Sequence, residues 1–396
     1  MYSLLPKGGL ELRGNINLRK EVFYWQDMKI KKITLRKIEI PMLTSFTTGF
    51  GTIDRKPTVL VRVETTDGII GWGESAALPY PMYNPESVDT CMLVIRDYLA
   101  SSVLNKPFET IEDINKLMSP VRENYIAKTG IETAIWMILS LARNKSIPEI
   151  LGGTRKKIEV GESIGIKKSI QETTEEIGLR LSQGFKRIKI KIKPGWDINL
   201  IKAIRIKYPD ISLMVDANSS YTLKDISLLK KMDNYNLTMI EQPLGDDDIV
   251  DHAVLQKQLR TPICLDESIL TLDDARRAIS IGSCKIINIK PGRVGGLNET
   301  KRISEHCQSK SVGVWIGGML EIGIGQAYKI AAASLQNCIY PGDLSPIDFY
   351  YKDDVLIDSP KVDKNGCIKV SQKPGLGYQI SEDKIKHYTV AKIDLK

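Results

Sequence analysis

The stretch RIKIKIKPGWD at residues 187–197 decides the fold, because it opens a series of similar segments. Each segment is a short apolar strand pattern that ends in a charged residue, and helical spacing separates it from the next. The following segments are SLMVDAN (212–218), LTMIEQPL (237–244), PICLDES (262–268) and KIINIKPG (285–292). Repeated strand–helix units predict a parallel sheet, which seven or eight such units close into an α/β barrel.

The charged residues of these segments recur at the length of one strand–helix unit. Lys191, Asp216, Glu241 and Asp266 follow one another at intervals of 25 residues, and Lys290 comes 24 residues later. One unit per interval places each charge at the C-terminal end of a successive strand, which is where barrel enzymes hold their chemistry. Chance does not readily produce five charges in one register.

The chain ahead of the barrel has a different pattern. Residues 31–75 carry three successive strand patterns, and Asp67-Gly68 predicts a hairpin turn between the second and the third. Residues 85–104 and 129–147 carry helical spacing instead. We therefore divide the chain into an extension without an assigned function (1–27), an α+β unit (28–155) and the barrel (156–344).

Composition excludes several classes of protein. The 396 residues carry a net charge of +8, 42% hydrophobic and 26% charged residues, which is ordinary for a globular protein. Basic residues are spread along the chain and mixed with acids, so we predict no nucleic-acid partner. No apolar stretch reaches the roughly 18 to 20 residues that cross a bilayer, and residues 1–27 lack the features of a signal peptide. Six separated cysteines without a CxxC pair predict reduced, buried thiols in a cytoplasmic protein.

The absence of several known motifs excludes some types of reaction and cofactor. The three histidines lie outside the strand-end segments, which argues against a histidine base, a zinc site and a Ser-His-Asp hydrolase. A GxGxxG motif after the first strand and a P-loop are also missing, so no nucleotide cofactor is indicated.

The three acids of the row predict a metal site. A single acid at a strand end is usually a helix cap or a loop carboxylate, but Asp216, Glu241 and Asp266 are in phase. Neighbouring strands lie about 4.8 Å apart, so three carboxylates would converge and repel one another. A divalent cation relieves that repulsion, and all-oxygen ligation suits Mg²⁺, with Mn²⁺ as a substitute.

The lysines of the row predict proton transfer. Lys189 and Lys191 alternate with isoleucines, so in a barrel they point inward while the isoleucines face the helices. A nearby metal and a second ammonium lower the pKa of a lysine and make it a base. We assign proton transfer to Lys191, modulation and charge neutralisation to Lys189, and the opposite face of a small carboxylate substrate to Lys290. The metal would bind the substrate carboxylate and stabilise the enediolate formed on deprotonation.

These motifs resemble the muconate-lactonising branch of the enolase superfamily. KIKPGWD, VDAN, IEQPL, PICLDES, NIKPGRVGG (288–296) and GGMLEIGIG (317–325) are similar to the group of o-succinylbenzoate synthases and N-succinylamino-acid racemases. The resemblance implies a (β/α)7β barrel under an N-terminal α+β capping domain that residues 345–396 complete. It also implies Mg²⁺ on the three acids. We further expect a homo-oligomer.

The resemblance also implies substrate contacts. They include cap loops at 43–52 and 78–83 that cover the site. One departure is Met137 in AIWM (134–137), where many relatives carry an acid, and it bears on stability or cap docking. The implied contact residues are Ser163, Asn218, Arg293, and the backbone of Gly317, Gly318, Met319 and Leu320.

Two reactions fit the same row. In the first, Lys191 takes the α-proton of 2-succinyl-6-hydroxy-2,4-cyclohexadiene-1-carboxylate, an intermediate of menaquinone synthesis, and a syn loss of water gives o-succinylbenzoate. In the second, Lys191 and Lys290 alternate as base and acid on an N-succinylamino acid. We favour the synthase and expect both activities, because Arg293 resembles an arginine of racemase-capable members. Dipeptide epimerase, muconate cycloisomerase and a non-catalytic metal-binding barrel stay open as alternatives.

Overall fold

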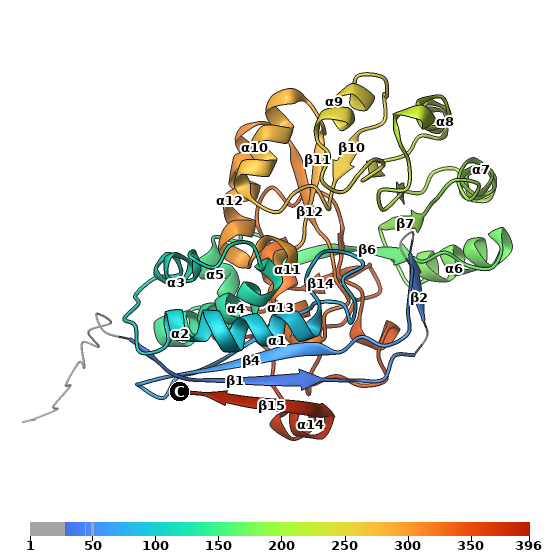
Figure 1. The fold of residues 1–396 in the computed structure, drawn as a ribbon. Coiled ribbons are helices and arrows are strands. Elements are labelled where there is room, and N and C mark those ends of the chain that lie inside the picture. Colours follow the sequence, from blue (N-terminus) through green and yellow to red (C-terminus); the bar gives the residue numbers. More distant parts are fainter. Residues whose placement is uncertain (1–27, 44, 49–50) are drawn as a thin grey trace, which may run out of the picture.

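The structure is a computed structural model that describes residues 28–43, 45–48 and 51–396. The extension predicted at 1–27 lies outside the described residues. Figure 1 shows a barrel of strands with helices around it, and beside it a sheet covered by helices. None of the helices in the described part is long and apolar enough to cross a bilayer.

The capping domain is built on a four-stranded antiparallel sheet. Its strands lie in the order β15, β1, β4, β5, with bounds Thr389–Leu395, Ile30–Ile38, Thr58–Thr65 and Ile70–Ser75. The hairpin predicted at Asp67-Gly68 is confirmed between β4 and β5, and Gly68 has the positive φ of +80° that such a turn requires. A small hairpin of β2 (Phe46–Thr48) and β3 (Gly51–Ile53) extends from this domain.

Helices cover one face of the cap sheet. The long helix α4, Tyr125–Arg143, lies against β5, where glycines allow the two backbones to touch. A Cβ at Gly71 would lie only 2.1 Å from the carbonyl oxygen of Ala134. Met137, the departure from the family pattern, accepts a hydrogen bond from the backbone N–H of Trp72 at this joint. The remaining helical segments are α1 (Val88–Val94), η1 (Ile95–Leu99), α2 (Ala100–Val103), α3 (Ile111–Met118) and α5 (Ile147–Leu151).

The barrel is nearly closed by eight parallel strands, which confirms the predicted fold class. The strands lie in the order β12, β11, β10, β9, β8, β7, β6, β13. Their bounds are β6 Lys157–Ile164, β7 Arg187–Lys191, β8 Leu213–Asp216, β9 Ile240–Glu241, β10 Ile263–Leu265, β11 Ile286–Ile289, β12 Gly313–Ile316 and β13 Gly342–Asp343.

Helices follow the barrel strands and enclose them. Inside the barrel, below the charged strand ends, a separate apolar cluster that includes Met214, Met239 and Trp315 fills the space. The helices are α6 Ile170–Ser182, α7 Ile198–Lys207, α8 Ile226–Met232, α9 Val250–Gln256, α10 Leu272–Ile281, α11 Pro291–Val294, α12 Leu297–Ser309 and α13 Gly323–Ala333, with 3₁₀ turns η2 Leu223–Asp225, η3 Asp233–Tyr235 and η4 Ile347–Phe349.

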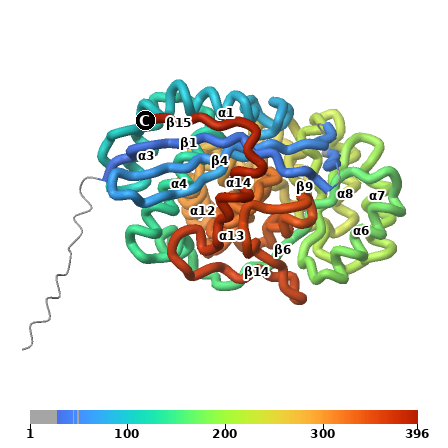
Figure 2. The backbone as a smooth tube through the Cα atoms, turned by 90° about the horizontal axis from the view of Figure 1, so that it is seen from below, coloured from blue at the N-terminus to red at the C-terminus, as the bar shows by residue number. Residues whose placement is uncertain are grey.

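The C-terminal segment joins both domains. Strand β14, Cys367–Lys369, pairs antiparallel with β6 of the barrel. After α14, Glu382–Tyr388, strand β15 then pairs with β1 at the edge of the cap sheet, and Figure 2 shows these red and blue strands side by side. The exact domain boundaries at residues 155 and 344 stay predictions.

Candidate active site

The five charged residues of the sequence register meet at one end of the barrel. Lys191, Asp216 and Glu241 are the last residues of β7, β8 and β9, and the ladder pairs Lys191 with Asp216 and Asp216 with Glu241. Asp266 and Lys290 directly follow β10 and β11. All five side chains are buried. The period of 25 residues therefore corresponds to neighbouring strands, as predicted.

Lys191 lies between an acid and an amide. Its Nζ donates to Asp216 Oδ2 at 2.6 Å and to Asn218 Oδ1 at 2.8 Å. The Nδ2 of Asn218 in turn donates to Glu267 Oε1 at 3.0 Å. Every group on this side comes from the barrel.

Lys290 has different partners, one of which comes from the cap. Its Nζ donates to Asp266 Oδ2 at 2.7 Å and to the hydroxyl of Tyr83 at 3.0 Å. Arg293 also forms an ion pair with Asp266 and donates to the Tyr83 hydroxyl at 3.0 Å. Burial lowers the pKa of Lys290, but Tyr83, Glu267 and nearby charges outweigh it, so this pKa lies above its ordinary value.

Lys189 lies deeper in the barrel among three carboxylates. Its Nζ is 2.6 Å from Asp343 Oδ2, 3.2 Å from Glu241 Oε2 and 3.5 Å from Asp216 Oδ2. Burial lowers the pKa of Lys189, yet the charges of these acids raise it above its ordinary value. Lys189 therefore stays an ammonium that neutralises the acids, which supports the predicted role. The sequence predicts that proton transfer uses a neutral lysine amine. That prediction requires a cation that offsets the negative charge of these carboxylates.

The arrangement of the three acids indicates whether a divalent metal fits between them. As the side chains lie, no group of three His, Cys, Asp or Glu residues within 28–43, 45–48 and 51–396 is arranged to hold a metal. The carboxylate oxygens form ion pairs with cationic side chains instead. Lys191 pairs with Asp216, and Lys290 and Arg293 pair with Asp266.

Glu241 is the acid of the cluster whose hydrogen bonding is incomplete. Its Oε1 accepts from Asn288 Nδ2 at 2.7 Å, but its buried Oε2 accepts no hydrogen bond from any described residue, although the Lys189 ammonium is 3.2 Å away. Burial and the charge of Asp216 raise the pKa of Glu241. A cation among three buried carboxylates fits this donor set once Lys191 releases Asp216 and Lys290 releases Asp266.

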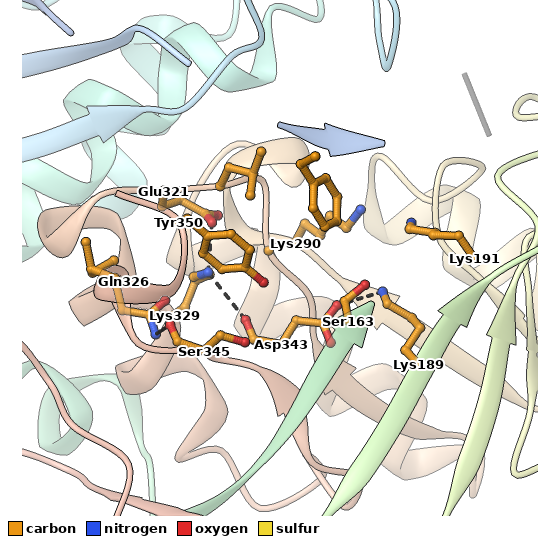
Figure 3. A pocket seen from close by; sticks show the side chains of 14 residues that line it. Ser163, Lys189, Lys191, Lys290, Glu321, Gln326, Lys329, Asp343, Ser345 and Tyr350 are labelled. Atoms are coloured by element: carbon orange, nitrogen blue, oxygen red, sulfur yellow. Dashed lines mark hydrogen bonds and ion pairs between the residues drawn. The ribbon is translucent and has the colours of Figure 1, made fainter. Parts of the chain in front are cut away.

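Two cavities open beside the lysines. Figure 3 shows the side chains of Lys191 and Lys290 pointing toward one another across the larger one. Of the predicted contact residues, Ser163, Asn218, Gly318, Met319 and Leu320 line these cavities.

Two predicted contacts lie outside this lining. Arg293 is 1% exposed and sits behind Asp266. Gly317 packs on Asn288, whose Oδ1 would lie 2.3 Å from a Cβ at that position. The substrate contacts of both residues stay predictions.

The cap loops reach the cavities as expected. Phe46, Ile53, Leu78 and Tyr83 line one or both of them, while residues 44, 49 and 50 of the predicted loop lie outside the described residues. The sequence motifs do not indicate a second set of lining residues, which lie in α13 and in the segment that follows it. They are Gln326, Lys329, Asp343, Ser345, Ile347 and Tyr350.

Comparison with known families matches both parts of the chain. Residues 32–152 match the N-terminal domain of mandelate racemase / muconate lactonizing enzyme, and residues 172–384 match the enolase C-terminal domain-like family. The chain belongs to the enolase superfamily. Members of this superfamily generally depend on a divalent metal.

Similar proteins agree with the membership. An o-succinylbenzoate synthase of Geobacillus stearothermophilus is 44% identical over 91% of this chain and 96% of its own length. An N-succinylamino acid racemase of Thermus thermophilus is 36% identical over 92% of this chain and 98% of its own. The crystal structure of an enolase superfamily member from Listeria innocua is 37% identical, with a TM-score of 0.90 over 93% of this chain and 99% of that one. The predicted family is confirmed.

Proposed function

We propose that this chain is an o-succinylbenzoate synthase that acts in menaquinone synthesis. The observation that carries the proposal is the pair of buried lysines, Lys191 and Lys290, which face each other across a cavity and are each bonded to a carboxylate. Relatives named o-succinylbenzoate synthase at 36–44% identity over nearly the whole chain support this choice of reaction.

The chain's residues divide the work as follows. Lys191 removes the α-proton of 2-succinyl-6-hydroxy-2,4-cyclohexadiene-1-carboxylate and returns it to the departing hydroxyl, which leaves as water from the same face. Lys290, as an ammonium on the opposite face, stabilises the negative charge that develops on the substrate carboxylate. Lys189 offsets the negative charge of the acids through its contacts with Glu241 and Asp343.

Asp216, Glu241 and Asp266 are the residues that we propose to hold Mg²⁺, with Mn²⁺ as a substitute. When bound, the metal supplies positive charge that stabilises the carboxylate of the substrate during deprotonation. Asp216 and Asp266 would then hold the cation in place of their ion pairs with Lys191 and Lys290, which would leave both lysines free for the substrate. The same carboxylates would therefore pair with the lysines in the metal-free site and hold the cation in the metal-bound site.

Racemisation of N-succinylamino acids is the second candidate activity. It is favoured by the symmetry of the site, because Lys191 and Lys290 point toward one another across the cavity and would place a basic side chain on each face of an α-carbon bound between them. Relatives named N-succinylamino acid racemase at 36–38% identity support it as well. Arg293, in contact with Asp266 and Tyr83, would hold the Lys290 side in place for its turn as base.

We also propose a cytoplasmic homo-oligomer. The cytoplasmic assignment is supported by the six cysteines, which are all free and buried, as expected from their spacing. The oligomer rests on the family resemblance and is tested by light scattering of the purified chain.

The test of function uses the purified chain with Mg²⁺, with Mn²⁺ and with a chelator. We expect dehydration of the cyclohexadiene carboxylate with either metal, slower racemisation of an N-succinylamino acid, and neither reaction after chelation. Racemisation without dehydration would reverse the order of the two activities. Turnover that survives complete chelation would reject the metal proposal.

A further inference from the structure

Asn218 stands between the proposed proton-transfer lysine and an acid that the mechanism does not use. We propose that Glu267 is a positioning residue for Lys191 and that it acts through the side-chain amide of Asn218. The inference rests on the proposed function, because it takes Lys191 as the group that moves the α-proton. It adds a residue and a coupling that the row of five charges does not contain.

The three side chains are joined by a continuous series of hydrogen bonds. Lys191 Nζ donates to Asn218 Oδ1 at 2.8 Å, and Asn218 Nδ2 donates to Glu267 Oε1 at 3.0 Å. The backbone N–H of Asn218 also donates to Asp216 Oδ1 at 3.0 Å, which fixes the residue beside the acid cluster. Asn218 has a φ of +41°, a left-handed conformation that asparagine tolerates better than most residues. All members are at most 9% exposed, so water does not replace these bonds easily.

Glu267 decides which way the amide faces. An asparagine amide has an acceptor end and a donor end, and in the structure its donor end, Nδ2, bonds Glu267 Oε1 as the acceptor. With Nδ2 directed at Glu267, Oδ1 must face Lys191. In the reversed orientation, the amide N–H groups would face the lysine nitrogen and its oxygen would face a carboxylate oxygen, so both hydrogen bonds of the observed orientation would be lost.

The orientation matters most when Lys191 is a neutral amine. An amine that donates an N–H to Asn218 Oδ1 keeps its lone pair for the substrate proton. A reversed amide would donate to that lone pair and compete with the substrate. Asn218 is also the partner that remains when Asp216 is needed for the cation, so it holds the Lys191 amine during proton transfer.

Within the described residues, the Glu267 side chain has one hydrogen bond, to Asn218, and none that would suggest another task. Its buried Oε2 accepts none from any residue in the described ranges, so the bond to Asn218 is the one through which it can orient a neighbour. These hydrogen bonds serve only the Lys191 face of the substrate, because the hydrogen-bond partners of Lys290 are Asp266 and Tyr83. Glu267 still contributes its charge to the field at Lys290, so a test must separate charge from orientation.

The experiment measures α-proton exchange of each enantiomer of an N-succinylamino acid in D₂O, at saturating Mg²⁺. Lys191→Ala first identifies the enantiomer whose proton Lys191 removes. Glu267→Leu and Glu267→Gln both remove the charge, but the Gln side chain can still accept from Asn218 through its carbonyl. We expect exchange on the Lys191 face to fall about 10- to 100-fold in the Leu variant, and the Gln variant to restore most of it.

A double-substitution cycle tests the route. If Glu267 acts through Asn218, Glu267→Leu adds little to Asn218→Leu, and both losses fall on the Lys191 enantiomer. Additive losses, or equal losses for both enantiomers, overturn the proposal. Should Glu267→Leu not fold, Glu267→Ala takes its place in the same cycle, with the same expected and contrary results.

Failure of the proposed function would be visible separately. It would show as absence of both exchange and dehydration in the wild-type enzyme. In that case crystal structures of the wild type and Glu267→Leu decide the positioning claim, which requires a Lys191–Asn218 hydrogen bond of about 3 Å in the first and its loss in the second.

Discussion

The two lysines of the site are set up in different ways. Lys191 is held by Asp216 and Asn218, both of which belong to the barrel. Lys290 is held by Asp266 and by Tyr83, which the capping domain contributes. One face of the substrate is thus served by a preformed part of the barrel, and the other is complete only when the cap is in place.

This difference separates the two proposed activities. Dehydration needs one base that takes and returns a proton, and the Lys191 side offers that without the cap. Racemisation needs both lysines to exchange protons, so it depends on the cap-completed side as well. We therefore expect changes at the Lys290 side and at the cap to affect racemisation more than dehydration.

The largest effect should come from Lys191→Ala. Both reactions begin with proton removal, so we expect dehydration and racemisation to fall by about 10³-fold or more in kcat. Lys193→Ala is the matched control, because Lys193 lies two residues further along the same stretch and is exposed. Steady-state kinetics with both substrates checks this, and undiminished dehydration in Lys191→Ala would remove Lys191 from the mechanism.

Lys290→Ala should slow racemisation more than dehydration. Racemisation should fall as far as in Lys191→Ala, since one of its two proton carriers is gone. Dehydration should fall less, by about 10²-fold, because only charge stabilisation is lost. The ratio of the two kcat values is the measurement, and an unchanged ratio would mean that the two sides are equivalent.

Tyr83→Phe should show a smaller effect on the cap-completed side. It removes the hydroxyl that bonds Lys290 and Arg293 while it keeps the ring, which lies 4.4 Å from the Lys290 nitrogen. Losing hydrogen bonds to charged groups costs about 1.5 to 3 kcal/mol, or roughly 10- to 100-fold in racemisation. Tyr80→Phe, at an exposed tyrosine of the same loop, should leave both reactions unchanged.

The smallest effect on activity is expected where the cap is attached to the barrel, because there the change acts on stability. Glu132 on α4 accepts the backbone N–H groups of Leu297 and Asn298 at the start of α12, and burial raises its pKa to about 7. The folded protein therefore keeps a proton that the unfolded chain releases above pH 4.5. The free energy of unfolding should fall as pH rises from 4.5 to about 7, by at most about 3 kcal/mol.

Glu132→Gln tests this contribution. Denaturant unfolding of both proteins between pH 4.5 and 8 gives the difference curve, which isolates Glu132 from other buried acids. We expect the variant to show less pH dependence in that window. Parallel curves for the two proteins would mean that Glu132 does not titrate there.

The sequence could predict the barrel and the row of charges because both follow from one period. Each of Lys191, Asp216, Glu241, Asp266 and Lys290 ends an apolar strand pattern, and parallel strands bring equivalent positions to one edge. The family match then confirmed the fold that this period predicts.

The rest of the site depends on contacts between distant segments. Tyr83 reaches Lys290 across 207 positions of the chain, and Asp343, a partner of Lys189, lies on a strand of only two residues. Neither position carries a periodic pattern. The direction of the Asn218 amide likewise follows from its neighbours in space, so no local signal in the sequence could have given it.

The most direct test of the account is α-proton exchange in D₂O, measured for both enantiomers of an N-succinylamino acid in Lys191→Ala and in Lys290→Ala. We predict reciprocal losses: one variant stops exchange of one enantiomer, and the other variant stops exchange of its mirror image. Loss of the same enantiomer in both variants would contradict the placement of the two lysines on opposite faces of the substrate.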